Sequence, residues 1–261
     1  MFLDVPDGRL EAQLIEGGSP ALVMLHEGLG SVRLWRGLPE RLHERTGAQV
    51  LAFSRFGHGE SDPPPRQRTP TFMHEEALQV LPEVLGAAGI EEPPILVGHS
   101  DGASIALIYA SEHPVAGLAL LAPHVFVEQV CVDAISETRE TFDNGGLRER
   151  MAHHHRDPDA AFHGWCDVWL DPGFRDWNLE PLLPKIHAPA LLIQGRDDEY
   201  GTLAQIDAIQ RGLAGPSERF IVSGGHSPHL EHPDEVPDAI VSFIDRLRVS
   251  PSTSEHPDAP R

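Results

Sequence analysis

Basic side chains are scarce in this sequence. The 261 residues include 20 lysines and arginines against 40 aspartates and glutamates, which gives a formal net charge of −20. A surface this acidic keeps a protein soluble and repels nucleic acid and anionic membranes, so neither is expected as a partner. The expected partner is a small-molecule substrate, and the oligomeric state does not follow from the sequence.

Cysteines and long apolar segments are scarce as well. Only Cys131 and Cys166 occur, without the spacing of a disulfide framework or a metal site, and a reducing compartment is the simplest inference. No apolar stretch approaches the roughly 20 residues needed to cross a bilayer. Residues 1–8 lack the basic and long apolar segments of a secretion signal. We therefore expect a soluble cytoplasmic protein.

Short apolar runs recur along the chain, with helical patterns between them. Six runs are typical of strands buried on both faces, as in a parallel sheet covered by helices: residues 21–25, 50–53, 95–97, 118–121, 190–193 and 219–222. Residues 2–15 are predicted to form an antiparallel hairpin at the sheet edge. The predicted helices are residues 32–46, 71–88, 102–111, 203–213 and 235–248, the second kinked or shortened at Pro82.

The alternation fails between Pro123 and Pro189. This stretch is rich in charge, histidine and tryptophan, and turn signals separate its helix-like pieces. A loop this long is implausible inside a compact domain, so a helical insertion over one end of the sheet is predicted. The predicted parts are an α/β core domain of residues 1–123 and 189–249, a helical cap of residues 124–188 and a disordered tail of residues 250–261.

The pentapeptide Gly98-His99-Ser100-Asp101-Gly102 lies between a predicted buried strand and a predicted helix. Small residues beside a serine at such a turn allow strained backbone geometry that exposes the hydroxyl above the N-terminus of the helix. This setting predicts a nucleophile elbow with Ser100 as the catalytic nucleophile. A serine that merely caps a helix is the alternative.

A serine hydroxyl is too weak an acid to attack unaided, so a histidine must take its proton and a carboxylate must orient that histidine. Asp198 and His226 each follow a predicted strand at its carboxyl end, where open α/β sheets build their sites. The order Ser100, Asp198, His226 is the one expected for such an elbow. The neighbouring alternatives are Asp197, His229 and His232.

An oxyanion formed at the substrate needs two backbone N–H donors. The amide of Asp101 directly follows the nucleophile at the start of the helix and is the first candidate. The second is expected from the loop after the first buried strand, His26-Glu27-Gly28-Leu29-Gly30, because its glycines let the backbone approach a ligand. Gly28 and Leu29 are both candidates for this donor.

Five segments of the chain together resemble the α/β-hydrolase superfamily. They are Leu25–Gly30, Ser54–Ser61, the pentapeptide around Ser100, Gly195–Asp198 and Gly225–Glu231. The resemblance implies an eight-stranded, mostly parallel sheet with helices on both faces, a helical cap after the sixth strand, and a Ser-Asp-His triad that uses no cofactor. The members most alike in layout are small esterases, enol-lactone hydrolases and carbon-carbon hydrolases of aromatic catabolism.

Two carboxylates depart from the common pattern of the superfamily. Glu27 stands where many members have glycine, and Asp101 occupies a position that is often apolar. Carboxylates near an oxyanion oppose its charge unless they point away. We therefore expect Asp101 to stabilise its helix N-terminus and Glu27 to be hydrogen-bonded in its loop, with a cationic substrate as the alternative. Serine rather than aspartate at position 100 argues against a haloalkane dehalogenase.

Phe162, Trp165 and Trp169 recur at helical spacing in the predicted cap. They form an apolar stripe that faces either the core domain or a pocket. Together with Glu27, the two tryptophans are the candidate pocket residues, suited to an apolar or aromatic acyl group. The run His153-His154-His155 predicts no metal site, because adjacent residues of a helix point in different directions.

Three functions remain. The leading hypothesis is a serine hydrolase that cleaves a carboxylic ester or lactone through an acyl-enzyme intermediate. The second is a carbon-carbon hydrolase of an anionic ring-cleavage product, whose pocket would need arginine. The arginines of the predicted cap are Arg139, Arg148, Arg150, Arg156 and Arg175. The third is a ligand-binding member of the fold with little turnover.

Overall fold

The computed structural model describes residues 1–249, and the predicted disordered tail lies outside the described residues. One eight-stranded sheet has the order β1-β2-β4-β3-β5-β6-β7-β8. Its strands are β1 (Phe2–Val5), β2 (Gly8–Ile15), β3 (Gly18–Leu25), β4 (Ala48–Phe53), β5 (Ile95–His99), β6 (Gly117–Leu121), β7 (Ala190–Gly195) and β8 (Ser217–Val222). The β1–β2 and β2–β4 pairs are antiparallel, and all other pairs are parallel. The predicted edge hairpin and mostly parallel sheet are confirmed.

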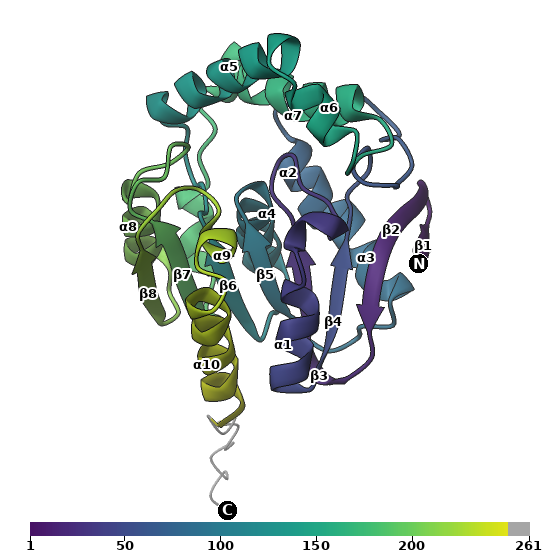
Figure 1. The fold of residues 1–261 in the computed structure, drawn as a ribbon. Helices are drawn as coiled ribbons and strands as arrows, with labels where there is room; N and C mark the ends of the chain where they lie inside the picture. The colour runs from purple at the N-terminus through teal and green to yellow at the C-terminus, as the bar shows by residue number, and fades with distance from the viewer. Residues whose placement is uncertain (250–261) are drawn as a thin grey trace, which may run out of the picture.

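Helices cover both faces of this sheet (Figure 1). On β3, Leu22 and Met24 point into a core layer shared with α1 (Leu38–Thr46) and α10 (Glu235–Val249). The alternate residues of β3, Val23 and Leu25, point into the opposite layer. That layer contains α3 (Leu81–Ala87), α4 (Asp101–Glu112) and α8 (Ala204–Gly212). Burial on both faces explains why the parallel strands are continuous apolar runs.

Two of the predicted helices are interrupted. Residues 32–46 form a 3₁₀ turn, η1 (Val32–Trp35), and then α1, because Arg36 and Gly37 both adopt left-handed backbone angles that end the first turn. Residues 71–88 form α2 (Phe72–Glu75), a π-helical turn η2 (Glu76–Val80) and α3. Pro82 follows the π-helical turn directly, and Val80 and Leu81 keep right-handed helical angles, so the helix changes type beside this proline rather than ending there.

The segment between β6 and β7 is helical and extends over the carboxyl ends of the strands (Figure 1). It contains α5 (Gln129–Asn144), α6 (Leu147–Met151), α7 (Pro158–Trp169), η3 (Pro172–Phe174) and η4 (Glu180–Lys185). The last of these packs against α4 and α8 beside the sheet. In the described part of the chain, no helix is both long and apolar enough to span a membrane.

Candidate active site

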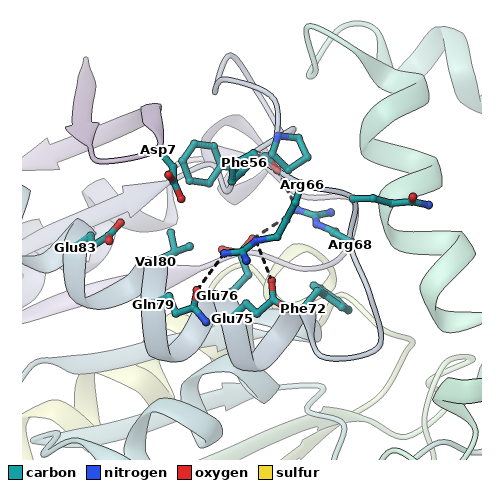
Figure 2. Close-up of a pocket in the computed structure, with 13 residues that line it drawn as sticks. Asp7, Phe56, Arg66, Arg68, Phe72, Glu75, Glu76, Gln79, Val80 and Glu83 are labelled. Atoms are coloured by element: carbon teal, nitrogen blue, oxygen red, sulfur yellow. Dashed lines mark hydrogen bonds and ion pairs between the residues drawn. The ribbon is translucent and has the colours of Figure 1, made fainter.

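Two hollows of the molecule differ in the side chains that line them. In the hollow of Figure 2, Arg66 reaches Gln79 (3.2 Å) and Glu75 (3.7 Å), and the described lining residues include no serine, cysteine or histidine. The other hollow, about 150 Å³ in volume, is lined by both Ser100 and His226 and by side chains of α5 and α7. The second hollow therefore brings a serine hydroxyl and a histidine ring together.

Ser100 occupies a strained turn between β5 and α4. Its backbone has φ 53° and ψ −118°, a conformation that costs a non-glycine residue about 1–3 kcal/mol and persists only when the surroundings enforce it. The amide of Ser100 donates to the carbonyl of Leu121 (2.9 Å). At Gly102, an added Cβ would lie 1.9 Å from the carbonyl oxygen of Leu25, so only glycine fits this close contact of α4 with β3.

Ser100, His226 and Asp198 form one chain of hydrogen bonds. The Oγ of Ser100 lies 2.9 Å from Nε2 of His226, and Nδ1 of the same ring lies 2.8 Å and 3.0 Å from the two carboxylate oxygens of Asp198. A carboxylate can only accept, so Nδ1 carries the ring proton and Nε2 faces the serine hydroxyl as an acceptor. The three predicted triad residues thus meet, with Ser100 and His226 at the wall of the pocket and Asp198 behind the histidine.

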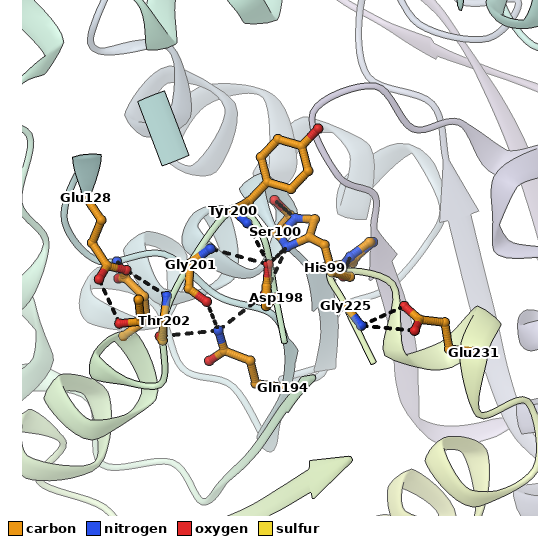
Figure 3. A network of polar contacts seen from close by, with 12 residues as sticks. His99, Ser100, Glu128, Gln194, Asp198, Tyr200, Gly201, Thr202, Gly225 and Glu231 are labelled. Carbon is orange, nitrogen blue, oxygen red and sulfur yellow. Dashed lines mark hydrogen bonds and ion pairs between the residues drawn. The ribbon is translucent and has the colours of Figure 1, made fainter. Parts of the chain in front are cut away.

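The carboxylate of Asp198 is held from several sides (Figure 3). It accepts from the backbone amides of Tyr200 (2.9 Å) and Gly201 (3.3 Å) and from the Nε2 amide of Gln194 (3.3 Å). Burial alone would raise the pKa of Asp198, but the hydrogen bond and charge of His226 and the Tyr200 amide hold it below its usual value. Asp198 therefore stays ionised beside the histidine.

The neighbouring candidates lie elsewhere. Asp197 is exposed, whereas Asp198 is buried. The ring of His229 packs against that of His99, with centroids 4.9 Å apart, and His232 bonds to the loop that precedes it. Within residues 1–249, none of the three makes a hydrogen bond to the Ser100–His226 pair.

The loop 26–30 borders the same pocket. Gly28 and Leu29 line it, and their backbone N–H groups have no hydrogen-bond acceptor within residues 1–249. The amide of Asp101 is the first of α4, and the first amides of a helix lack an intrahelical partner. The predicted oxyanion donors therefore all border the pocket with their N–H groups unused by the rest of the fold.

The side chain of Asp101 contacts the segment between β6 and β7. Its Oδ1 accepts from Nε1 of Trp169 (3.1 Å), whereas Oδ2 is buried without a hydrogen-bond partner among the described residues. Burial raises the pKa of Asp101, although the charge of Arg55 and the Trp169 bond favour the ionised form. The carboxyl thus combines its place in the first turn of α4 with a contact to α7.

Glu27 contacts the residue that precedes the serine. Its Oε2 lies 3.5 Å from Nδ1 of His99, and Nε2 of His99 donates to the backbone carbonyl of His226 (2.8 Å). Burial alone would raise the pKa of Glu27, but this histidine holds it well below its usual value. The Glu27 carboxylate is thus balanced by an imidazole, and the predicted contact within its own loop is not its principal one.

The helical segment above the strands contributes aromatic and sulfur side chains to the pocket. Trp165 and Trp169 line it, whereas Phe162 stacks on Phe142 with ring centroids 3.9 Å apart. Lining residues that the sequence did not single out are His124, Cys131, Ile135 and Tyr200. Two features of the sequence point to these residues. Tyr200 lies two residues after Asp198, and Cys131 and Ile135 have the i, i+4 spacing of one helix face. Both cysteines are free and buried.

The arginines of the predicted cap lie away from this pocket. Arg139 pairs with Asp167 and Arg148 with Asp159, and both arginine side chains are substantially exposed. The described residues that line the pocket include no arginine or lysine, but they include the carboxylates of Glu27 and Asp101. A pocket of this charge is poorly suited to an anionic substrate.

A family model described as alpha/beta hydrolase fold matches residues 20–172, more than half of the chain. The chain belongs to the α/β-hydrolase family. The resemblance carried by the five sequence segments is therefore confirmed, and the protein is a hydrolase of this fold.

Curated relatives of the α/β-hydrolase chain are hydrolases. This chain is 26% identical to the human serine hydrolase BPHL over 87% of this chain and 80% of the relative. It is also 26% identical to a pimeloyl-[acyl-carrier protein] methyl ester esterase of Stenotrophomonas maltophilia, over 89% of this chain and 96% of the relative. Among solved structures, an esterase from Exiguobacterium antarcticum superposes with a TM-score of 0.73 at 23% identity, covering 94% of this chain and 99% of that one.

Proposed function

We propose that this α/β-hydrolase cleaves carboxylic esters or lactones through an acyl-enzyme intermediate. The observation that carries the proposal is the 2.9 Å contact between Ser100 Oγ and His226 Nε2, with Asp198 on the other ring nitrogen, at the wall of a partly apolar pocket. The names of the two curated relatives, a serine hydrolase and a methyl ester esterase, agree with this chemistry.

Acylation begins with proton transfer. His226 Nε2 takes the hydroxyl proton of Ser100 as Oγ bonds to the carbonyl carbon, and the carbonyl oxygen becomes an oxyanion. Asp198 stabilises the imidazolium that forms. When the tetrahedral intermediate collapses, the bond to the alcohol oxygen breaks and the alcohol takes the proton back from Nε2. In a lactone the released alcohol stays attached to the acyl group.

Deacylation repeats these steps with water. His226 takes a proton from the water as its oxygen attacks the acyl carbon, and the second intermediate releases Ser100 Oγ, which regains the proton from Nε2. The oxyanion of both intermediates is stabilised by the amide of Asp101 and by that of Gly28 or Leu29, whose N–H groups have no other acceptor among the described residues.

The pocket favours neutral esters over anionic substrates. Glu27 and Asp101 place two carboxyl groups in its wall, without an arginine or lysine among the described lining residues. Trp165 and Trp169 give it apolar surface for an acyl or aryl group. A ring-cleavage dienoate, which carries a carboxylate, fits this charge less well than an aryl ester.

A rapid-mixing assay with a short nitrophenyl ester tests the proposal. We expect a burst of one equivalent of nitrophenol per enzyme, no burst and negligible turnover in Ser100→Ala, and little cleavage of a coloured ring-fission dienoate. The circular dichroism of Ser100→Ala should match the wild type. Full turnover in Ser100→Ala would overturn the proposal, and wild-type protein that binds the ester without cleaving it would indicate a ligand-binding member of the fold.

A further inference from the structure

Three histidine rings face the carbonyl oxygens of three consecutive residues in the loop 26–30. The pairs are His26 Nδ1 with Glu27 O (2.7 Å), His58 Nε2 with Gly28 O (2.8 Å) and His155 Nε2 with Leu29 O (3.0 Å). The rings also contact one another, with centroids 4.9 Å apart for His26 and His58 and 5.7 Å apart for His58 and His155. One compact cluster of imidazoles thus holds the outer side of the loop.

For His26 and His155, the second ring nitrogen fixes the tautomer. The backbone amide of Arg55 donates to His26 Nε2 (3.0 Å), and that of Gly59 donates to His155 Nδ1 (3.1 Å). A backbone N–H can only donate, so these nitrogens are acceptors and the opposite nitrogens carry the hydrogens that bind the carbonyls.

The ring of His58 is held in the same way by a side chain. Nη2 of Arg68 lies 3.2 Å from His58 Nδ1, and Arg68 itself is balanced by Glu76 (3.7 Å; Figure 2). The Phe56 carbonyl also lies 3.1 Å from Nδ1, but it accepts from Nη2 of Arg68 (2.9 Å). Within residues 1–249 the Gly28 carbonyl has His58 Nε2 as its hydrogen-bond partner, so we assign the hydrogen of the neutral His58 ring to Nε2. Burial lowers the pKa of His58, as it does for the other two rings, so all three are neutral near pH 7.

These contacts set the direction of the amides. In a trans peptide, the C=O of one residue and the N–H of the next point in opposite directions. Holding the carbonyls of Glu27 and Gly28 against the histidines therefore turns the N–H groups of Gly28 and Leu29 away from them. These are the two amides without an acceptor within residues 1–249, and both residues line the pocket.

His155 differs from the other two rings in its origin. It lies between α6 and α7, in the segment above the strands, and its side chain is buried. His155 binds Leu29 and Gly59, and the amide of Arg156 donates to the carbonyl of Gly59 (2.8 Å). These hydrogen bonds connect the segment between β6 and β7 to two loops that follow strands of the sheet.

We propose that His155 is a positioning residue of the oxyanion site. By donating to the Leu29 carbonyl it fixes the Leu29–Gly30 peptide, whose N–H closes the loop on the Glu27 carbonyl (3.0 Å), and it thereby supports the two preceding peptides that present the Gly28 and Leu29 amides to the reacting carbonyl. This role rests on the proposed ester hydrolysis. A loop that is free to rotate its peptides would bind a planar ester nearly as well but would stabilise the tetrahedral oxyanion less.

The test compares three variants. His155→Phe fills the volume without either hydrogen bond, His155→Gln keeps an N–H donor on a flexible chain, and His153→Phe is the matched control, because His153 is an exposed neighbour. Each is assayed for kcat and KM on a nitrophenyl ester and for inhibition by an alkyl boronic acid, which forms a tetrahedral adduct, and by the planar amide analogue of the ester.

For His155→Phe we expect kcat to fall by about 10- to 100-fold with KM nearly unchanged, and boronate affinity to fall by a similar factor while amide affinity is kept. His155→Gln should recover part of both losses, and His153→Phe should behave as wild type. Equal losses of boronate and amide affinity, or a change in melting temperature alone, would overturn the role of His155.

Two further measurements separate the possible failures. If His155→Phe does not fold, His155→Gln and nitrogen-15 NMR of the wild type decide the question, because the inference requires a neutral ring protonated on Nε2. A wild-type ring protonated on Nδ1 would contradict it. Wild-type protein that neither cleaves the ester nor binds the boronate would overturn the proposed function and this role together, whereas an active wild type with an indifferent His155→Phe overturns this role alone.

Discussion

The two sides of the pocket are built in different ways. On the side of β7 and β8, the proposed reacting groups are side chains that bind one another, from Asp198 through His226 to Ser100. On the side of the loop 26–30, the proposed oxyanion donors are backbone amides, and three histidine side chains bind the carbonyls of the same loop. Chemistry on the first side depends on which residues are present, and on the second side it depends on which way peptides point.

The largest effect is expected from a substitution among the three hydrogen-bonded side chains on the first side of the pocket. Asp198→Asn should lower kcat/KM for a nitrophenyl ester by about 10⁴-fold, because an amide in place of the carboxylate favours the wrong tautomer of His226. The exposed neighbour provides the control, and Asp197→Asn should change kcat/KM by less than about threefold. Equal effects of the two substitutions would show that the orienting acid has been misassigned.

Low pH should destabilise the protein by protonating the neutral histidines that bind the carbonyls of the loop 26–30. Burial lowers the pKa values of His26, His58 and His155, and the charges of Arg55 and Arg68 add to this for the first two rings. The folded state then binds fewer protons than the unfolded state, so stability is fully present above the unfolded histidine pKa and is lost as the pH falls below it. Each ring contributes at most about 1.4 kcal/mol per pH unit, between the unfolded pKa of roughly 6.5 and its own lowered pKa in the folded state.

Urea unfolding at pH 7.5, 6.5 and 5.5 measures this loss. The free energy of unfolding should fall most steeply in the lower interval, and His155→Gln should make the fall shallower by about the share of one proton. His153→Gln, at the exposed neighbour, should leave the slope unchanged. A free energy of unfolding that is constant from pH 7.5 to 5.5 would contradict the neutral state of the cluster.

Gly28→Ala tests the position of the loop against the helix above it. An added Cβ would lie 2.2 Å from Cδ1 of Trp165, so the loop or the tryptophan must move, and we expect kcat to fall by about 100-fold. Adding Trp165→Ala should restore most of the kcat lost relative to Trp165→Ala alone. Gly86→Ala, where a Cβ meets nothing within 4 Å, is the control. Full activity of Gly28→Ala would show that the loop at Gly28 does not need to pack closely against Trp165.

The smallest expected effect concerns the negative charge of the Asp101 carboxylate, which lines the pocket. Asp101→Asn keeps an acceptor for Trp169 and should change kcat/KM for a neutral aryl ester by less than about threefold at pH 8. For an aryl hemisuccinate, which is anionic, kcat/KM should rise by several fold because one repulsive charge is removed. An unchanged ratio between the two esters would mean that the Asp101 carboxyl either is neutral, in the direction that its burial favours, or does not face the acyl group.

The same contrast explains what the sequence could predict. Ser100, Asp198 and His226 follow strands in recognisable turns, so their types and order pointed to one edge of the sheet before any coordinates were known. The alternation of apolar runs likewise predicted the sheet. The break at Arg36 and Gly37 was missed because helical periodicity continues across it, although a left-handed backbone interrupts the helix.

The amide donors of the loop 26–30 could be predicted from the sequence only in part. The sequence singled out Gly28 and Leu29 without deciding between them, since peptide orientation depends on His58 and His155, which are 30 and 126 residues away from the carbonyls they bind. The run of three histidines suggests only a metal site from the sequence, and the directions of adjacent helical side chains exclude one. Its third ring has both nitrogens occupied by backbone groups, a use that no spacing pattern predicts.

Labelling with a fluorophosphonate, followed by peptide mass analysis, tests the central claim most directly. A nucleophilic serine activated by His226 predicts a single adduct on Ser100, formed rapidly in the wild type and essentially absent in a folded His226→Ala variant. Absence of labelling in folded wild-type protein, or an adduct on another residue that forms equally fast without His226, would contradict the account.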